Sequence, residues 1–349
     1  MNRTLAVSFC VAAILTLGAG SAKSADDKPA LRPLDAWTNV FAGEPVVLRY
    51  GCRFESDDPV KIAWTLSAGN QQVLDRGSID VVEANKAEPI AVRCKMPLVR
   101  DELVMPVELT VAMFSDSSAE PLAVSRKKFR CFPRDPFAEQ KEWLKGLHIA
   151  LYDPPGATAR LFDKAKIPYA RFAVLPTEGH AANAVIWIVG EGISWSDFPG
   201  LPDNLLAAAS QGRPVLCMAA AAGELPLPAP GDQPMNGRLL LENSRLIADL
   251  DSRLDAIAWP PDGHVASRAL RLTAAEGAMQ VKVAQEPQGW IWLEQQFTSG
   301  GRLMVCQCEI VKHWDAGPAP RYLLARILER LSGGNKGQDG IPAKLDEIR

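Results

Sequence analysis

The spacing of apolar residues changes near residue 133, and this change constrains the fold more than any other feature of the chain. From residue 30 to residue 133, apolar and polar residues alternate over short runs such as VVLRYGCRF (46–54) and KIAWTLS (61–67). Alternation with a period of two is typical of strands that bury one face. Turn-forming clusters separate the runs, so residues 30–133 are predicted to form a β-sandwich of roughly seven strands.

After residue 146 the apolar runs no longer alternate, and they are interspersed with helical patterns. The clearest strands and helices are LHIALYD (147–153), GATARLFDKAKI (156–167), AVIWIVGEG (184–192), LPDNLLAAASQG (201–212) and RPVLCMA (213–219). This order predicts a parallel sheet that is covered by helices on both faces, over residues 147–332. The remaining predicted elements are a helix over 239–250, strands over 290–297 and 301–311, and a closing helix over 319–331.

The two parts meet in a short joint at residues 134–146. Asp135 is suited to cap a helix, Pro136 fits the first helical position and Gly146 fits the end. Residues 134–146 are therefore predicted to form a linker helix.

The first 25 residues have the pattern of a secretory signal peptide. Arg3 precedes the apolar run LAVSFCVAAILTL, and small residues follow, which predicts cleavage near Ala22 to Ala25. An uncleaved anchor is the alternative, although an apolar run of about 13 to 16 residues is short for a membrane helix. The protein is predicted to be exported to the periplasm or the cell exterior. No membrane span is expected in the mature chain, and residues 333–349 are predicted to form a flexible tail.

Charge argues against a nucleic-acid partner. The chain has 38 Lys and Arg residues against 41 Asp and Glu residues, a formal net charge of −3, whereas nucleic-acid binders show basic clusters. The four histidines, at 148, 180, 264 and 313, are scattered, and no glycine-rich phosphate loop opens a helix. No metal and no cofactor are predicted.

The interval from Cys52 to Trp64 resembles the start of an immunoglobulin domain, which has a tryptophan on its third strand. The run VELTVAMF lacks the second cysteine of that family, and Cys94 lies instead on the preceding strand. Because exported proteins can form disulfides, this resemblance implies a Cys52–Cys94 disulfide. Separate buried thiols at Cys52, Cys94 and Cys131 fit the pattern equally well.

The second part resembles the class I glutamine amidotransferase-like family, whose sheet is flavodoxin-like. The order of strands and helices carries the resemblance over residues 147–332, together with IVGEG, GRPVLCMA and the closing pair GRLMVCQCEI and PAPRYLLARILERL. Similar domains occur in exported bacterial proteins, often beside glycoside-hydrolase modules. The resemblance therefore implies a carbohydrate or cell-envelope partner.

The same resemblance implies that this domain is catalytically degenerate. Active members place a cysteine nucleophile in G-I-C-x-G, where small neighbours let backbone amides approach the substrate oxyanion. In PVLCMAAA, Cys217 matches the first glycine, Ala219 the nucleophile and Ala221 the second glycine. A methyl group cannot attack a carbonyl, and the family's His-Pro-Glu segment is absent, since residues 313–315 read HWD. Cys217 itself is expected to be an inert buried thiol.

Other site candidates follow the predicted strands, because open α/β sheets bind ligands beyond the carboxyl ends of their strands. These candidates are Asp153, Glu191, Glu224, His313 and Asp315. Carboxylates and a histidine can perform acid–base catalysis or hold a metal. The alternative is that they cap helices or remain solvated.

Trp195, in ISWSDFPG (193–200), is a candidate platform for stacking a sugar, with a packed loop anchor as the alternative. The leading hypothesis is an exported, non-catalytic binding or assembly protein with a carbohydrate or cell-envelope partner. The competing hypothesis is a hydrolase, glycosidase-like or other, that uses the carboxylates and the histidine. A third option is a dimerising scaffold, in which the protein forms a homodimer through a large apolar face of the flavodoxin-like domain.

Overall fold

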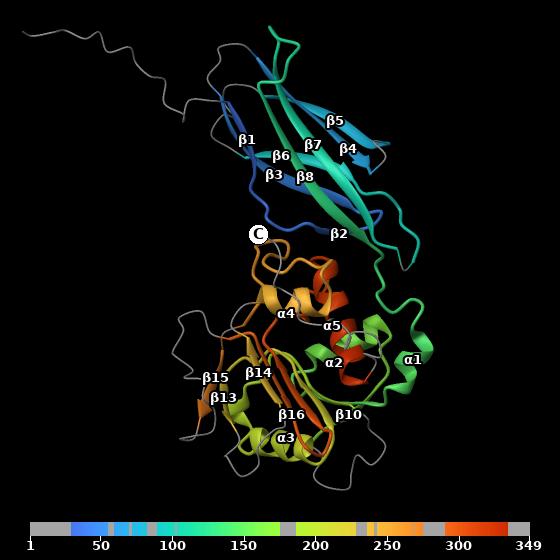
Figure 1. The fold of residues 1–349 in the computed structure, drawn as a ribbon, viewed down its shortest axis with the longest axis vertical. Coiled ribbons are helices and arrows are strands. Elements are labelled where there is room, and N and C mark those ends of the chain that lie inside the picture. The colour runs from blue at the N-terminus through green and yellow to red at the C-terminus, as the bar shows by residue number, and fades with distance from the viewer. Residues whose placement is uncertain are drawn as a thin grey trace, which may run out of the picture.

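The computed structural model combines a β region with a mixed α/β region (Figure 1). It describes residues 29–54, 59–69, 72–81, 89–101, 103–174, 186–227, 236–240, 243–267, 269–274 and 290–333. The predicted signal peptide (1–25), its cleavage site and nearly all of the predicted tail (333–349) lie outside the described residues.

Two sheets form the β region. The three-stranded sheet has the order β1-β3-β6, with β1 Ala30–Pro33, β3 Pro45–Arg53 and β6 Ile90–Lys95. The five-stranded sheet has the order β2-β8-β7-β4-β5, with β2 Asn39–Phe41, β4 Val60–Ala68, β5 Val73–Val81, β7 Met105–Ser115 and β8 Ala123–Phe132.

Alternating burial explains how these sheets pack. In β3, Leu48 and Tyr50 are fully buried, while their neighbours Val47 and Arg49 are exposed. Apolar residues from both sheets meet in one core, to which β4 contributes Ile62. The burial pattern predicted from the alternating sequence is therefore observed in these strands.

The Cys52–Cys94 disulfide that was predicted is absent. Both cysteines are free, and the antiparallel register of β3 and β6 places Cys94 opposite Val46. Cys52 lies six residues farther along β3 and pairs with Leu31 of β1. At about 3.4 Å per residue, this offset is far beyond the reach of a disulfide.

The joint between the regions contains less helix than predicted. Within residues 134–146, only Lys141–Gly146 is helical, as α1. Asp135 does cap, but it accepts a hydrogen bond from the Phe137 amide at 2.8 Å within a turn that precedes the helix.

A seven-stranded sheet forms the centre of the α/β region. Its strand order is β10-β9-β11-β12-β17-β16-β14, and the first five strands are parallel. The last two strands run antiparallel to their neighbours. The strands are β9 Ile149–Tyr152, β10 Tyr169–Phe172, β11 Ile186–Val189, β12 Pro214–Cys217, β14 Asn236–Leu240, β16 Trp292–Gln296 and β17 Arg302–Cys306.

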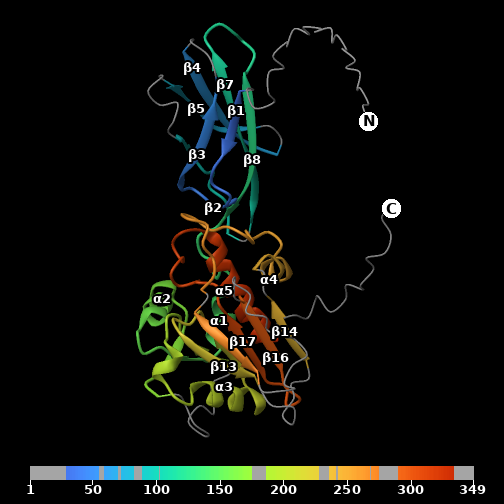
Figure 2. The ribbon, with the colours of Figure 1, turned by 90° about the vertical axis from the view of Figure 1, so that its left-hand side faces the viewer.

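Helices cover both faces of this sheet, as the continuous burial of its central strands requires. The helices are α2 Ala157–Ala165, α3 Leu201–Ser210, α4 Asn243–Leu250 and α5 Pro318–Leu331. Helices α1, α2, α4 and α5 contribute to the core on one face, and α3 contributes to the core on the other (Figure 2). Within the described ranges, no helix is long and apolar enough to cross a bilayer.

One predicted helix was placed too early in the sequence. The helix predicted over 239–250 begins only at Asn243, because residues up to Leu240 belong to strand β14. A further two-stranded parallel sheet, formed by β13 (Gly223–Leu227) and β15 (Leu270–Ala274), was not predicted.

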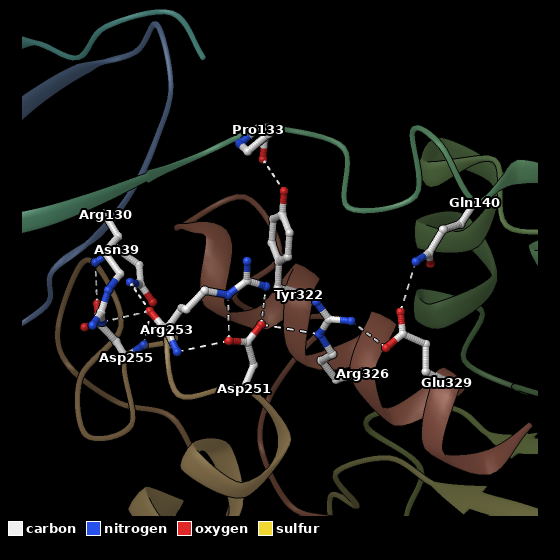
Figure 3. A network of polar contacts seen from close by, with 10 residues as sticks. All are labelled: Asn39, Arg130, Pro133, Gln140, Asp251, Arg253, Asp255, Tyr322, Arg326 and Glu329. Atoms are coloured by element: carbon white, nitrogen blue, oxygen red, sulfur yellow. Dashed lines mark hydrogen bonds and ion pairs between the residues drawn. The ribbon is translucent and has the colours of Figure 1, made fainter. Parts of the chain in front are cut away.

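The loop after α4 fastens the two regions together through Asp255 (Figure 3). The Asp255 carboxylate accepts hydrogen bonds from the Thr38 amide at 2.5 Å and the Asn39 amide at 2.6 Å. The Asn39 side chain in turn donates to the Arg253 carbonyl at 3.0 Å. Backbone of the β region is therefore bound directly by a loop of the α/β region.

A second group of contacts extends this junction along α5. Asp251 forms ion pairs with Arg253 at 2.6 Å and Arg326 at 3.3 Å (Figure 3). The Tyr322 hydroxyl donates to the Pro133 carbonyl at 3.1 Å, and its ring contacts Phe132 with centroids 4.8 Å apart. The junction therefore combines apolar contacts with hydrogen bonds between buried groups.

Candidate functional site

The strand order reverses at β9, whose two neighbours are β10 and β11, and Asp153 follows β9 directly. Its side chain is fully buried, and its Oδ2 accepts a hydrogen bond from the Ala159 amide at 2.8 Å. Asp153 therefore caps α2. A Cβ on Gly190 would lie 2.7 Å from Asp153 Oδ1, so only glycine fits beside this carboxylate.

Glu191 follows β11 and holds a distant turn in place. Its carboxylate accepts hydrogen bonds from the Val311 amide at 2.8 Å and the Lys312 amide at 2.9 Å. Its own amide donates to Thr158 Oγ1 at 2.8 Å. Burial raises the pKa of Glu191 to about 7, and the two backbone amides act in the opposite direction.

His313 lies close to Glu191 because it belongs to the same turn. Its ring is buried, and its Nε2 lies 3.5 Å from a Glu309 carboxylate oxygen. The ring also contacts that of Trp259 edge to face, with centroids 6.3 Å apart. Glu309 also contributes to raising the pKa of Glu191. Glu191, Glu309 and His313 thus lie together at one edge of the sheet. The two that were predicted from the sequence, Glu191 and His313, are buried.

Ala219, which the resemblance aligns with an amidotransferase nucleophile, does not lie on a nucleophile elbow. Such an elbow joins a strand to a helix through a strained turn, whereas β12 is followed by strand β13. Ala219 is buried, lacks a positive φ, and accepts a hydrogen bond from the Gly192 amide at 2.8 Å. Cys217 is a fully buried free thiol whose pKa is raised by burial.

The other two charged candidates lie in separate places. Asp315 is exposed and pairs with Lys164 at 2.6 Å and Arg321 at 2.8 Å; the hydrogen bond from Lys164 is the main cause of its lowered pKa. Glu224 lies on β13 and pairs with Arg271 at 2.6 Å. Both residues are used in ion pairs of their own, so the five predicted candidates do not form one site.

Trp195 is not an exposed platform for a sugar. Its side chain is only 3% exposed and belongs to the core beneath the short 3₁₀ helix Trp195–Asp197. A Cβ on Gly223 would lie 2.5 Å from the Trp195 Cβ, which shows how closely the chain packs there. The indole is the packed loop anchor that the alternative interpretation described.

A different feature, here called the basic cavity, lies where α1, the end of α2 and the start of α5 meet. Its volume is about 490 Å³. Asp135 is the single carboxylate in its lining. Six cationic side chains line it as well: Arg134, Lys141, Lys145, Lys164, Lys166 and Arg321. A neighbouring cavity of about 520 Å³ at the junction of the two regions shares Arg134. Neither cavity is lined by Asp153, Glu191 or His313.

The cationic residues of the basic cavity were not identified from the sequence. The available signal is two short pairs of lysines, Lys141 with Lys145 and Lys164 with Lys166. Each pair alone is ordinary for a solvated helix, and only the fold brings the two pairs to one cavity. Within the described ranges, no group of three or more His, Cys, Asp or Glu side chains is arranged to hold a metal.

Comparisons with known proteins give little further information. No protein-family model matches the chain, and no curated protein matches it by sequence. Among solved structures, a β-glucuronidase from Bifidobacterium dentium, complexed with coumarin-3-O-glucuronide, is 12% identical with a TM-score of 0.20. A β-glycosidase from Bacteroides vulgatus is 11% identical with a TM-score of 0.21. A glycosyl hydrolase family 2 member from Bacteroides cellulosilyticus is 10% identical with a TM-score of 0.23.

Each match covers only part of this chain and only part of the matched protein. The matches cover 55%, 59% and 54% of this chain, in the order given above. The chain spans only 44%, 35% and 35% of those proteins. Similarity at this level transfers no site residue to the present chain.

Proposed function

We propose that this chain is an exported, non-catalytic binding or assembly protein whose partner is a carbohydrate or another component of the cell envelope. In this proposal an immunoglobulin-like β-sandwich is joined to a degenerate domain of the class I glutamine amidotransferase-like family. One observation carries the non-catalytic part. The candidate acid–base residues are used as structural hydrogen-bond acceptors or as partners in surface ion pairs.

The position of the family nucleophile supports the same proposal. Ala219 offers no attacking atom, and its backbone is hydrogen-bonded within buried chain. Cys217 is enclosed in apolar surroundings, which disfavour the thiolate that nucleophilic attack requires.

The test is to measure binding and turnover on the same purified protein. A glycan array and a thermal-shift screen should identify at least one carbohydrate ligand, while assays for released reducing ends and for glutamine hydrolysis should remain at background. The variant Ala219→Cys should also show no glutaminase activity, because the strand-to-helix turn is missing as well as the sulfur. Failure to bind any glycan or envelope fraction would overturn the proposal.

A hydrolase is the second candidate function, and one observation favours it. The pKa of Glu191 is raised to about 7, and Glu309 and His313 lie beside it at the edge of the sheet. A carboxylic acid with such a pKa is suited to general acid catalysis near neutral pH.

The variant Glu191→Gln separates this second candidate from the first. Glycan hydrolysis by the wild-type protein that falls at least about a hundredfold in Glu191→Gln would establish a catalytic role. The matched control is Glu224→Gln, which changes a carboxylate in an exposed ion pair away from the turn. No hydrolysis by the wild-type protein, with glycan binding retained in both variants, supports the non-catalytic function.

A further inference from the structure

We propose that the basic cavity binds an acidic saccharide, a sugar ring that bears a carboxylate or a sulfate group. This inference rests on the proposed carbohydrate-binding function and assigns it a site and a ligand chemistry. The volume of about 490 Å³ lies within the range of small-molecule sites. The chain as a whole has a net charge of −3, whereas six cationic side chains and one carboxylate line the cavity. Three further carboxylates, of Asp315, Glu142 and Glu44, pair with four of these cations, so the excess of positive charge rests on the remaining two.

Four of the six cationic side chains already have acidic partners. Lys164 and Arg321 both pair with Asp315. Lys145 pairs with Glu142 at 2.7 Å, and Arg134 pairs with Glu44 at 3.1 Å. Because these four side chains are paired with carboxylates, little of their positive charge is left for a ligand.

The other two cationic residues, Lys141 and Lys166, supply the charge for a ligand. Both are exposed, and neither forms a salt bridge within the part of the chain that the structure describes. Lys141 is the first residue of α1, and Lys166 is the C-cap residue that follows α2, so they approach the cavity from two different elements. An anionic group bound between them would neutralise two like charges at once.

The rest of the lining favours a ligand with an apolar face. The apolar side chains that a ligand can reach are Pro168, which is exposed, and Pro136 and Ala165, which are half-buried. Buried Phe137, Leu144 and Trp314 lie behind them in the lining. A simple inorganic anion gains nothing from such a surface. A sugar ring can place its C–H groups against these aliphatic side chains while its charged substituent reaches the lysines.

Arg321 is positioned to keep this lining rigid. Its guanidinium lies 5.3 Å from the centre of the Trp314 ring and 4.6 Å from that of Phe41. It also donates hydrogen bonds to the carbonyls of Trp314 at 2.9 Å and Arg134 at 2.8 Å. The aromatic part of the cavity is therefore formed before any ligand arrives, which reduces the entropy lost on binding.

The experiment compares polymers that differ in charge on the wild-type protein and on two double variants. Dextran sulfate, polygalacturonate, neutral dextran and a single-stranded oligodeoxythymidylate are titrated at low and at high salt. Lys141→Glu/Lys166→Glu reverses the two charges at the cavity. Lys61→Glu/Lys128→Glu makes the same net change at exposed positions on β4 and β8. Thermal midpoints verify that both variants fold.

We expect dextran sulfate, polygalacturonate or both to bind the wild-type protein, and neutral dextran not to bind. The affinity should fall about tenfold or more in Lys141→Glu/Lys166→Glu and change little in the control. Which of the two acidic polymers binds distinguishes a sulfate from a carboxylate. Added salt should weaken the interaction because exposed charges are screened.

Three results would overturn the inference. The first is an equal loss of affinity in both double variants, which would mean that only the total charge matters. The second is oligonucleotide binding as tight as saccharide binding through the same two lysines. The third is binding of neutral glycans that Lys141→Glu/Lys166→Glu leaves unchanged, a result that retains the proposed carbohydrate-binding function. Absence of binding to every glycan overturns the inference too, and the proposed function falls with it only if no envelope fraction binds either.

Discussion

The carboxyl edge of the parallel sheet and the basic cavity both gather charged side chains, but they use them in different ways. At the sheet edge, Asp153 and Glu191 are buried, and their carboxylates accept hydrogen bonds from backbone amides. In the basic cavity, Lys141 and Lys166 are exposed and without salt bridges within the described ranges. Position in the fold alone therefore does not identify a binding residue. What separates the two groups is whether the charge already has a partner.

The largest effect should come from removing the buried carboxylate at the sheet edge. Glu191→Ala leaves the amides of Val311 and Lys312 without an acceptor, so the free energy of unfolding at pH 6 should fall by about 3 kcal/mol. Urea denaturation measures this change. Glu142→Ala is the control, because that side chain is 87% exposed. Equal effects of the two substitutions would show that the sheet edge is not held by Glu191.

The pH dependence of stability should reveal the same residue. The folded-state pKa of Glu191, about 7, lies above the ordinary value of 4.5, so the folded protein retains a proton that the unfolded chain releases. Stability from this group is therefore complete below about pH 4.5 and is lost as the pH rises to about 7, by about 3 kcal/mol in total. The difference in unfolding free energy between Glu191→Gln and wild type should follow this curve. A difference that is constant from pH 4.5 to 7.5 would contradict the assignment.

A smaller loss is expected at the other buried carboxylate. Asp153→Ala removes the acceptor for the Ala159 amide at the start of α2, which should cost about 1 to 2 kcal/mol in denaturation experiments. Asp153→Asn retains an oxygen acceptor and should lose less. If the two variants were equally unstable, the role of Asp153 would be its charge rather than its capping bond.

The smallest change in stability is expected in the basic cavity. Lys141→Ala and Lys166→Ala should each alter the unfolding free energy by less than about 0.5 kcal/mol, because these exposed side chains have no salt bridge to lose in the described structure. Thermal denaturation measures the change. A loss close to that of Asp153→Ala would place these lysines among the structural charges and remove the contrast between the two regions.

Sequence patterns predicted the secondary structure correctly where a whole strand, or one long stripe of a helix, is buried. The strands at the centre of the parallel sheet are buried on both faces, and their continuous apolar runs identified them, as for Ile186–Val189. The closing helix was also identified, because α5 presents one long apolar stripe to the core.

The patterns failed where partners distant in sequence decide the outcome. Residues 239–241 are three leucines, an apolar run that fits a helix or a strand equally well. Pairing of β14 with β16, more than 50 residues later, makes the described part of this run a strand. The absence of the Cys52–Cys94 disulfide likewise depends on the register of β3 with β6, and the spacing of cysteines in the sequence does not predict that register.

Site prediction was limited for a related reason. Glu191 was chosen for its place after a strand, and that place is correct, but the sequence contains no sign that Val311 and Lys312 would occupy its carboxylate. Trp195 was chosen for its polar neighbours, yet its indole is buried in the core. Lys141 and Lys166 are 25 positions apart in the sequence, and only the tertiary fold brings them to one cavity.

The junction between the two regions has a mechanical consequence. The β region and the α/β region lie end to end along the longest axis of the molecule (Figure 1), and Arg134 follows directly after the strand and proline that connect them. Arg134 also forms part of the cavity wall and is tied to α5 through Arg321. Tension that pulls the two regions apart would therefore load the cavity wall through Arg134, together with the contacts of Asp255 and Tyr322 at the junction.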